Sequence, residues 1–344
     1  MADFIEGYGD QQLPPPYTFQ GVRVWSFPLL ARFDKVQSVV QKCLEPATDS
    51  SSDVSINLLQ GRSRDSEART FVYMMVLDYR KMACKNPPEC EMGSYTQKEL
   101  LFGIPVVQQT QDGPPNIALF CPYIFVDNGG SMVCGNTVLG YPKQPAWFQV
   151  PPPGGGSYPI RIDVPVMARQ GPGAQQTWQR LVHVRAVNRF AEDLSKLVDN
   201  AAAVVEDVAE AVTDVDEDLE QTWPFGPIGR LLGEGGPLPV PPNLLALFRE
   251  RPDISYGILQ LKQIRSAEDP TKACYRSLLS CTSKLEELRS FGMLPDAVIE
   301  LASYPSLDIA EALGLLSENG KIRPWFPYRM ECDFDFIDAR ERVF

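Results

Sequence analysis

The sequence lacks the patterns that mark most metal, nucleotide and membrane proteins. It contains one histidine, His183, and none of its eight cysteines forms a C-x-x-C pair, so the usual zinc-binding patterns are missing. No G-x-G-x-x-G motif follows a predicted strand, and no Walker A motif occurs. No run of about 18 apolar residues is present, so we expect no transmembrane helix and no membrane partner. Nothing in the sequence calls for a metal or an organic cofactor.

Basic charge is also scarce. The net charge of -12 argues against binding to nucleic acid, which needs a basic surface. Most of the acidity lies in residues 192–220, which hold eleven acidic residues against one base, Lys196. The first residues, MADFIEGYGDQQLPPPY, are acidic and polar and do not resemble a secretory signal. We therefore expect a cytoplasmic protein whose cysteines are free thiols.

The chain is rich in segments that are typical of strands. Residues 1–16 are predicted to be a flexible lead-in, and residues 17–187 to be mainly strands with one helix at 34–46. His183 lies in the alternating stretch RLVHVRAV, where we expect a strand residue with a local partner and not a catalytic group. The stretch 116–141 is interpreted as two strands around a turn at 127–130. Strand patterns return at 254–267 and 272–281, and at 328–338 the side chains of 330, 332, 334 and 336 are expected on one face.

One segment has a different period. Between 190 and 223 apolar residues recur every three or four positions, which predicts a long amphipathic helix with an acidic outer face. The helix is either a solvated surface helix or, because its period is close to 3.5, a contact between subunits of a homo-oligomer. It lies in a block at about 188–239 that interrupts the strand-rich pattern. The sequence thus predicts a single domain over 17–344 with a helical insertion.

The stretch GYPKQPAWF (140–148) places Lys143 in an apolar, proline-bounded run. A lysine with its ordinary pKa of about 10.4 is almost fully protonated at neutral pH. Burial among apolar groups favours the neutral amine, which can attack a ketone and form a Schiff base. From this stretch alone, the alternative is a surface lysine whose alkyl stem covers a turn.

The wider stretch FVDNGGSMVCGNTVLGYPKQ (125–144) resembles the signature of the acetoacetate decarboxylase superfamily. In that signature a strand ends in Asp-Asn, Gly-Arg-Glu follows, and an aromatic residue, a proline and two lysines complete it. Other parts of the chain are similar to family segments in the same order, at 16–46, 94–106, 241–267, 294–312 and 328–337. The resemblance covers roughly 17–187 and 240–338. It implies an α+β, mainly antiparallel β fold with a cone-shaped β-barrel or sheet core, into which the long acidic helix is inserted.

The resemblance also implies a site. Lys143 matches the lysine that forms the Schiff base, and acetoacetate decarboxylase is an established case of an activated lysine. The family's catalytic glutamate falls at Glu99 when counted back from Ile-Pro-Val at 104–106, or at Gln97 when counted from Tyr-Thr at 95–96; Glu99 is preferred. Tyr141 and Trp147 are expected to line or orient the site.

Several positions depart from the family pattern. Gln144 replaces the second lysine but is still expected beside the substrate. Asn136 and Thr137 replace the Arg-Glu pair, and Asn136 is retained as a substrate-binding candidate. The substrate-side arginine aligns with Val22, so Arg23 is the neighbouring candidate, on the opposite strand face unless a bulge shifts it.

These departures argue against simple decarboxylation of acetoacetate. The favoured function is a lysine Schiff-base lyase of aldolase, dehydratase or decarboxylase type, which acts on a small keto compound with Glu99 moving protons. One alternative keeps the fold without the imine and catalyses a cyclisation or pericyclic step. The other is a non-catalytic binding protein.

Overall fold

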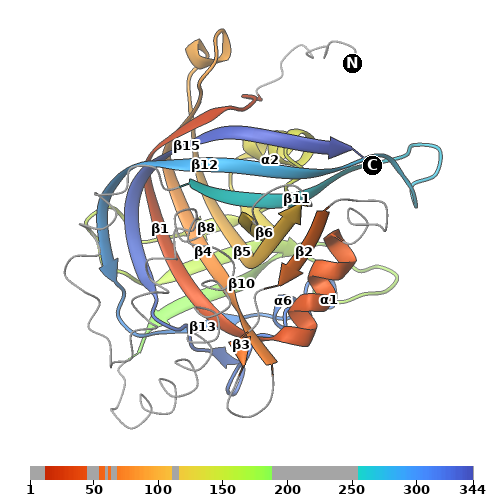
Figure 1. Ribbon diagram of the computed structural model, residues 1–344. Coiled ribbons are helices and arrows are strands. Elements are labelled where there is room, and N and C mark those ends of the chain that lie inside the picture. Colours follow the sequence, from red (N-terminus) through yellow and green to blue (C-terminus); the bar gives the residue numbers. More distant parts are fainter. Residues whose placement is uncertain are drawn as a thin grey trace.

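The computed structural model describes residues 12–44, 54–58, 61–62, 68–110, 116–187 and 255–343 (Figure 1). Most of these residues lie in strands, and helices are few. The expected class, mainly antiparallel β with few helices, is confirmed. The predicted acidic helix at 190–223, the block at 188–239 that contains it, and residues 1–11 of the predicted lead-in lie outside the described residues. No described helix is long and apolar enough to cross a membrane.

The larger of two sheets has ten strands and is strongly curved (Figure 1). Its order is β2-β5-β4-β1-β15-β12-β11-β6-β7, with β3 paired to β4, and β5 also pairs with β6. Most pairs are antiparallel, whereas β6 is parallel to both β7 and β11. The strands are β1 (Tyr17–Arg32), β2 (Val54–Leu58), β3 (Gly61–Arg62), β4 (Ala68–Cys84), β5 (Tyr95–Thr110), β6 (Asn116–Val126), β7 (Lys143–Pro145), β11 (Ser255–Arg265), β12 (Ala273–Met293) and β15 (Tyr328–Val343).

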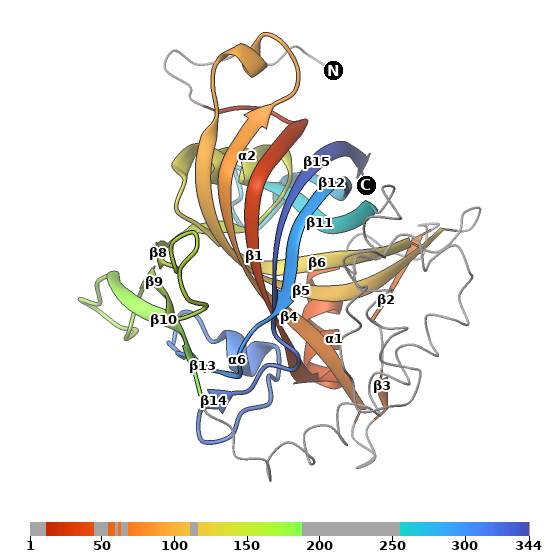
Figure 2. The same ribbon diagram turned by 90° about the vertical axis from the view of Figure 1, so that its left-hand side faces the viewer.

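The smaller sheet has five strands in the order β14-β13-β10-β9-β8. Figure 2 shows it as a separate layer to the left of the large sheet. Its strands are β8 (Trp147–Gln149), β9 (Ile160–Val166), β10 (Thr177–Ala186), β13 (Ala297–Leu301) and β14 (Lys321–Ile322). His183 lies in β10, where its Nδ1 is 3.3 Å from Oε2 of Glu300 on β13, a local partner of the kind expected.

Four short helical elements complete the described chain: α1 (Phe33–Leu44), the 3-10 turn η2 (Glu89–Glu91), α2 (Gly129–Val138) and α6 (Ile309–Ala312). The predicted helix at 34–46 is therefore confirmed as α1. The interpretation of 116–141 as two strands is wrong, because the second segment is α2. The Asn128 side chain accepts a hydrogen bond from the Ser131 backbone N–H at 2.9 Å, which caps the helix and starts it immediately after β6.

Strand β1 serves two hydrophobic cores. Its second half packs Trp25, Phe27 and Leu29 into a core shared with α1 and the small sheet. Its first half sends Tyr17 and Phe19 to the other core, within the curve of the large sheet. The predicted alternation on β15 is confirmed, because residues 330, 332, 334 and 336 face this second core. The second core surrounds a cavity.

Candidate active site

The cavity lies within the curve of the large sheet and has a volume of about 150 Å³. Its walls come mainly from β1, β4, β5, β12 and β15, and most of the lining side chains are aromatic, aliphatic or methionine. Two charged residues stand out among them, Lys143 and Glu99. A concave, apolar pocket with a few convergent polar groups is the usual form of a small-molecule site.

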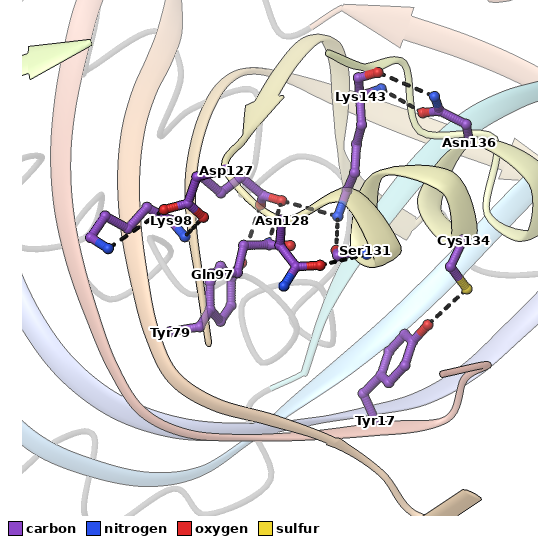
Figure 3. Close-up of polar contacts among 11 residues, drawn as sticks. Tyr17, Tyr79, Gln97, Lys98, Asp127, Asn128, Ser131, Cys134, Asn136 and Lys143 are labelled. Atoms are coloured by element: carbon purple, nitrogen blue, oxygen red, sulfur yellow. Dashed lines mark hydrogen bonds and ion pairs between the residues drawn. The ribbon is translucent and has the colours of Figure 1, made fainter. Parts of the chain in front are cut away.

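The backbone of Lys143 is fixed at the edge of the large sheet. The residue opens β7, and its register partner on the parallel strand β6 is Ile124. The Asn136 side chain brackets the residue from α2: its Oδ1 accepts from the Lys143 N–H at 2.8 Å, and its Nδ2 donates to the Lys143 carbonyl at 3.2 Å (Figure 3). Asn136 therefore positions the lysine and does not face the substrate space.

The amine of Lys143 points into the cavity wall, where the residue is only 8% exposed. Its Nζ lies 3.2 Å from Oε2 of Glu99. It also donates to the Ser131 hydroxyl at 3.0 Å (Figure 3). It also lies 5.8 Å from the centre of the Tyr141 ring, within the range of a cation–π contact. The structure thus brings together three of the residues singled out from the sequence, Lys143, Glu99 and Tyr141.

Glu99 is held by two further side chains. The Tyr79 hydroxyl donates to its Oε1 at 3.1 Å, and Gln97 Nε2 donates to its Oε2 at 3.1 Å. Gln97 and Glu99 are two residues apart on β5 and share the cavity face, whereas Lys98 between them pairs with Asp127 outside. Both positions considered for the family's glutamate therefore reach the site, and Glu99 is the one that touches the lysine.

Helix α2 leaves room for the lysine stem. A Cβ atom at Gly135 would lie 2.6 Å from Cδ and 2.9 Å from Cε of Lys143, closer than carbon atoms approach. Ser131, one turn earlier on the same helix, meets the far end of the side chain. The helix thus supplies the space for the stem, the hydroxyl for the amine and, through Asn136, the backbone contacts.

Two other ionisable side chains of the cavity, Tyr141 and Cys121, are held in apolar surroundings. Burial raises the pKa of the Tyr141 phenol well above its ordinary value, with the neighbouring Cys281 adding to the effect. Burial, with a smaller effect of the Glu99 charge, also raises the pKa of the Cys121 thiol. Burial therefore favours the protonated form of both side chains.

Three predicted substrate contacts lie elsewhere. Gln144 and Trp147 are exposed, and 52% of the Trp147 surface is accessible. Each follows a buried residue, Lys143 or Ala146, and adjacent residues of a strand face opposite sides. Arg23 donates to the Pro151 carbonyl at 2.8 Å, forms an ion pair with Asp78 and lies over the Trp25 ring, outside the cavity.

The bulge in β1 explains the placement of Arg23. The register of β1 against β15 shifts between Phe19 and Val22, at Gly21, which has a φ of 62°. Simple alternation from Phe19 would put residues 21 and 23 on the cavity side. With the extra residue, Val22 and Val24 take that side and Arg23 faces away.

Sequence reasoning missed Tyr79, Ser131 and Gly135. The alternation of Met75, Leu77 and Tyr79 on β4 is a signal for the first, since all three line the cavity. The other two were hidden because their segment was interpreted as a strand, in which residues four apart lie about 13 Å from each other. In a helix, residues four apart are neighbours on one face, so both can contact the same side chain.

No protein-family model and no curated protein matches the chain. Among solved structures, the chain is similar to acetoacetate decarboxylase from Legionella pneumophila, with a TM-score of 0.53 and 11% identity over 100% of this chain and 99% of that one. A second acetoacetate decarboxylase matches with a TM-score of 0.48 and 9% identity over 96% and 90% of the two chains. An acetoacetate decarboxylase-like enzyme from Sphingomonas wittichii RW1 matches with a TM-score of 0.43 and 12% identity, over 99% of both. On the first of these comparisons, the chain has the acetoacetate decarboxylase fold.

Proposed function

We propose that the protein is a lysine Schiff-base enzyme that acts on a keto compound, with Lys143 as the nucleophile and Glu99 as the group that moves protons. The observation that carries the proposal is the Lys143 amine, buried 3.2 Å from the Glu99 carboxylate in an otherwise apolar cavity. The shared fold with acetoacetate decarboxylase supports an enzyme, although a fold alone does not fix a reaction.

The ion pair provides a route to the reactive amine. Transfer of one proton from Nζ to the carboxylate converts two buried charges into a neutral amine and a neutral acid. The amine then attacks the substrate carbonyl, and Glu99 returns the proton to the carbinolamine hydroxyl, which leaves as water. Ser131 keeps the amine in place, while Tyr79 and Gln97 hold the carboxyl group.

The resulting iminium determines the reaction type. Its positive charge accepts the electrons of a neighbouring carbon–carbon or carbon–hydrogen bond when that bond breaks. Cleavage of an aldol, loss of water, or loss of carbon dioxide all follow this course. The aldolase type is favoured, because Arg23 faces away from the cavity and cannot bind a departing carboxylate.

Reductive trapping tests the proposal. The protein is incubated with a panel of ketones, keto acids and β-keto acids in the presence of cyanoborohydride, and the peptide that contains Lys143 is examined by mass spectrometry. The expected result is the added mass of the reduced substrate at Lys143. Lys143→Met should abolish the adduct, whereas the control Lys98→Met, on the outer face of β5, should retain it.

A second candidate keeps the site but not the imine. The same buried ammonium, paired with Glu99, could stabilise negative charge on a carbonyl oxygen during a cyclisation. In that case Lys143→Arg, which keeps the charge but cannot form a Schiff base, would retain turnover while no adduct forms. Loss of turnover in Lys143→Arg together with a trapped adduct favours the Schiff base.

A further inference from the structure

We propose that the substrate is an uncharged carbonyl compound with an apolar body and a hydroxyl group on the β-carbon. The inference rests on the proposed Schiff base and adds the class of compound that the cavity accepts. Three observations support it: the balance of charge in the cavity, the character of its walls, and an unpaired acceptor beside the Glu99 carboxylate.

The charges of the cavity already neutralise each other. Lys143 and Glu99 are the one cation and the one anion among the described residues that line it, and they form an ion pair. The second cation expected from the sequence, Arg23, is held outside by Asp78 and Pro151. A carboxylate on the substrate would enter a buried space without a free partner, which is strongly unfavourable.

The walls away from the ion pair fit an apolar body. Phe19 and Phe334 stack with their ring centres 4.5 Å apart, and Phe291 and Tyr328 stack at 5.4 Å. All four line the cavity. An apolar cavity of roughly 150 Å³ holds a molecule of about the size of benzene.

Gln97 supplies an unpaired acceptor at the ion pair. The residue is 2% exposed, and its Oε1 has no hydrogen-bond partner among the described residues. Its orientation is fixed, because the Nε2 group donates to the Glu99 carboxylate and the reversed amide would turn oxygen against oxygen. Buried acceptors without partners are rare in folded proteins, and a hydroxyl hydrogen of the substrate is the donor that this one lacks.

A hydroxyl at this place has a role in the reaction. Once Lys143 has formed the iminium with loss of water, the hydroxyl hydrogen turns from Gln97 Oε1 to the neighbouring Glu99 carboxylate, which takes the proton. The bond between the α- and β-carbons breaks, its electrons pass to the iminium, and an aldehyde or ketone leaves. The remaining enamine takes a proton at the α-carbon, and water releases the second carbonyl compound and the free amine. The sum is one hydroxy ketone converted into two carbonyl compounds.

Two pairs of ketones of equal shape test the inference by reductive trapping at Lys143. Levulinate carries a carboxylate where methyl isoamyl ketone carries an isopropyl group. The uncharged ketone should be trapped on the order of 100-fold faster. Diacetone alcohol carries a hydroxyl group on the β-carbon where methyl neopentyl ketone carries a methyl group. The hydroxy ketone should be trapped about 10-fold faster, and it should release acetone.

Gln97→Met separates recognition of the hydroxyl from a general effect on the site. The variant removes the acceptor for the hydroxyl. It also removes a partner of Glu99, and this second loss slows the trapping of both ketones of the second pair alike. The ratio of their trapping rates should therefore fall to about one, whatever happens to the absolute rates.

Each result decides between distinct ideas. An adduct with none of the four compounds overturns the proposed Schiff base and the inference with it. Faster trapping of levulinate than of methyl isoamyl ketone leaves the Schiff base intact and overturns the uncharged substrate. Equal trapping of diacetone alcohol and methyl neopentyl ketone by the unmodified protein overturns the hydroxyl.

Discussion

The substitution Gly135→Ala tests whether the space left by α2 sets the position of the Lys143 amine. The added Cβ would lie 2.6 Å from Cδ of Lys143, about 1 Å short of ordinary carbon contact. The lysine stem must move by that amount, away from the helix, and the amine is displaced from its position against Ser131. A displacement of about 1 Å at a reacting group lowers a rate by roughly 100-fold.

The free energy of unfolding should change very little. Alanine is better than glycine inside a helix by up to about 1 kcal/mol, which offsets part of the cost of the new contact. The rate of reductive trapping at Lys143 is measured together with the free energy of unfolding in urea. A large loss of trapping at nearly unchanged stability is the expected combination.

Gly129→Ala is the matched control, because it lies in the same helix and no heavy atom lies within 4 Å of the position of its Cβ. This variant should trap the ketone as the unmodified protein does. If Gly135→Ala also traps at the unmodified rate, the lysine stem is not held against the helix and the reasoning about its position is wrong.

Three further predictions concern charge and thiols. Lys143→Met leaves the Glu99 carboxylate buried without its cation and should lower the free energy of unfolding in urea by about 3 kcal/mol. Adding Glu99→Gln should restore most of the lost stability. A double variant no more stable than the single one would contradict the role of the ion pair. The exposed Cys90 and Cys274 should react rapidly with a thiol reagent in the native protein, and the buried thiols only after unfolding, as counted by mass spectrometry. Burial raises the pKa of Cys281 and of Cys332 to about 12. Between about pH 9 and 12 the unfolded chain therefore loses protons that the native protein keeps, and the free energy of unfolding should fall. A free energy of unfolding that does not change over this range would refute the assignment.

Much of the strand framework could be predicted from residue patterns. The alternation at 330–336 and the helix after Asp34 depend on local periodicity, and both are present. Helix α2 was missed because most of its residues are β-branched, small or glycine, which are poor helix formers. Its start is determined by one side-chain hydrogen bond from Asn128, which periodicity does not show.

Two residues of the candidate site could be predicted from the sequence. Lys143 was identified by its motif, and Glu99 by its distance in sequence from Ile-Pro-Val at 104–106. Lys143 and Glu99 are 44 positions apart in sequence, and they meet because β5, β6 and β7 are neighbours in one sheet. The expected contacts of Gln144 and Trp147 were wrong because proximity in sequence was taken as proximity in space. On a strand, adjacent residues face opposite sides, so the lysine's apolar surroundings come from β1, β4, β12 and β15 instead.

The bulge in β1 has a consequence for how proteins of this shape diverge. The two halves of the strand alternate out of phase, and one additional backbone residue at Gly21 joins them. The length of this short stretch determines whether position 22 or position 23 borders the cavity. An insertion or deletion of one residue there exchanges a valine for an arginine on the wall. The cavity can thus change from balanced charge to a net positive charge without a single amino-acid substitution.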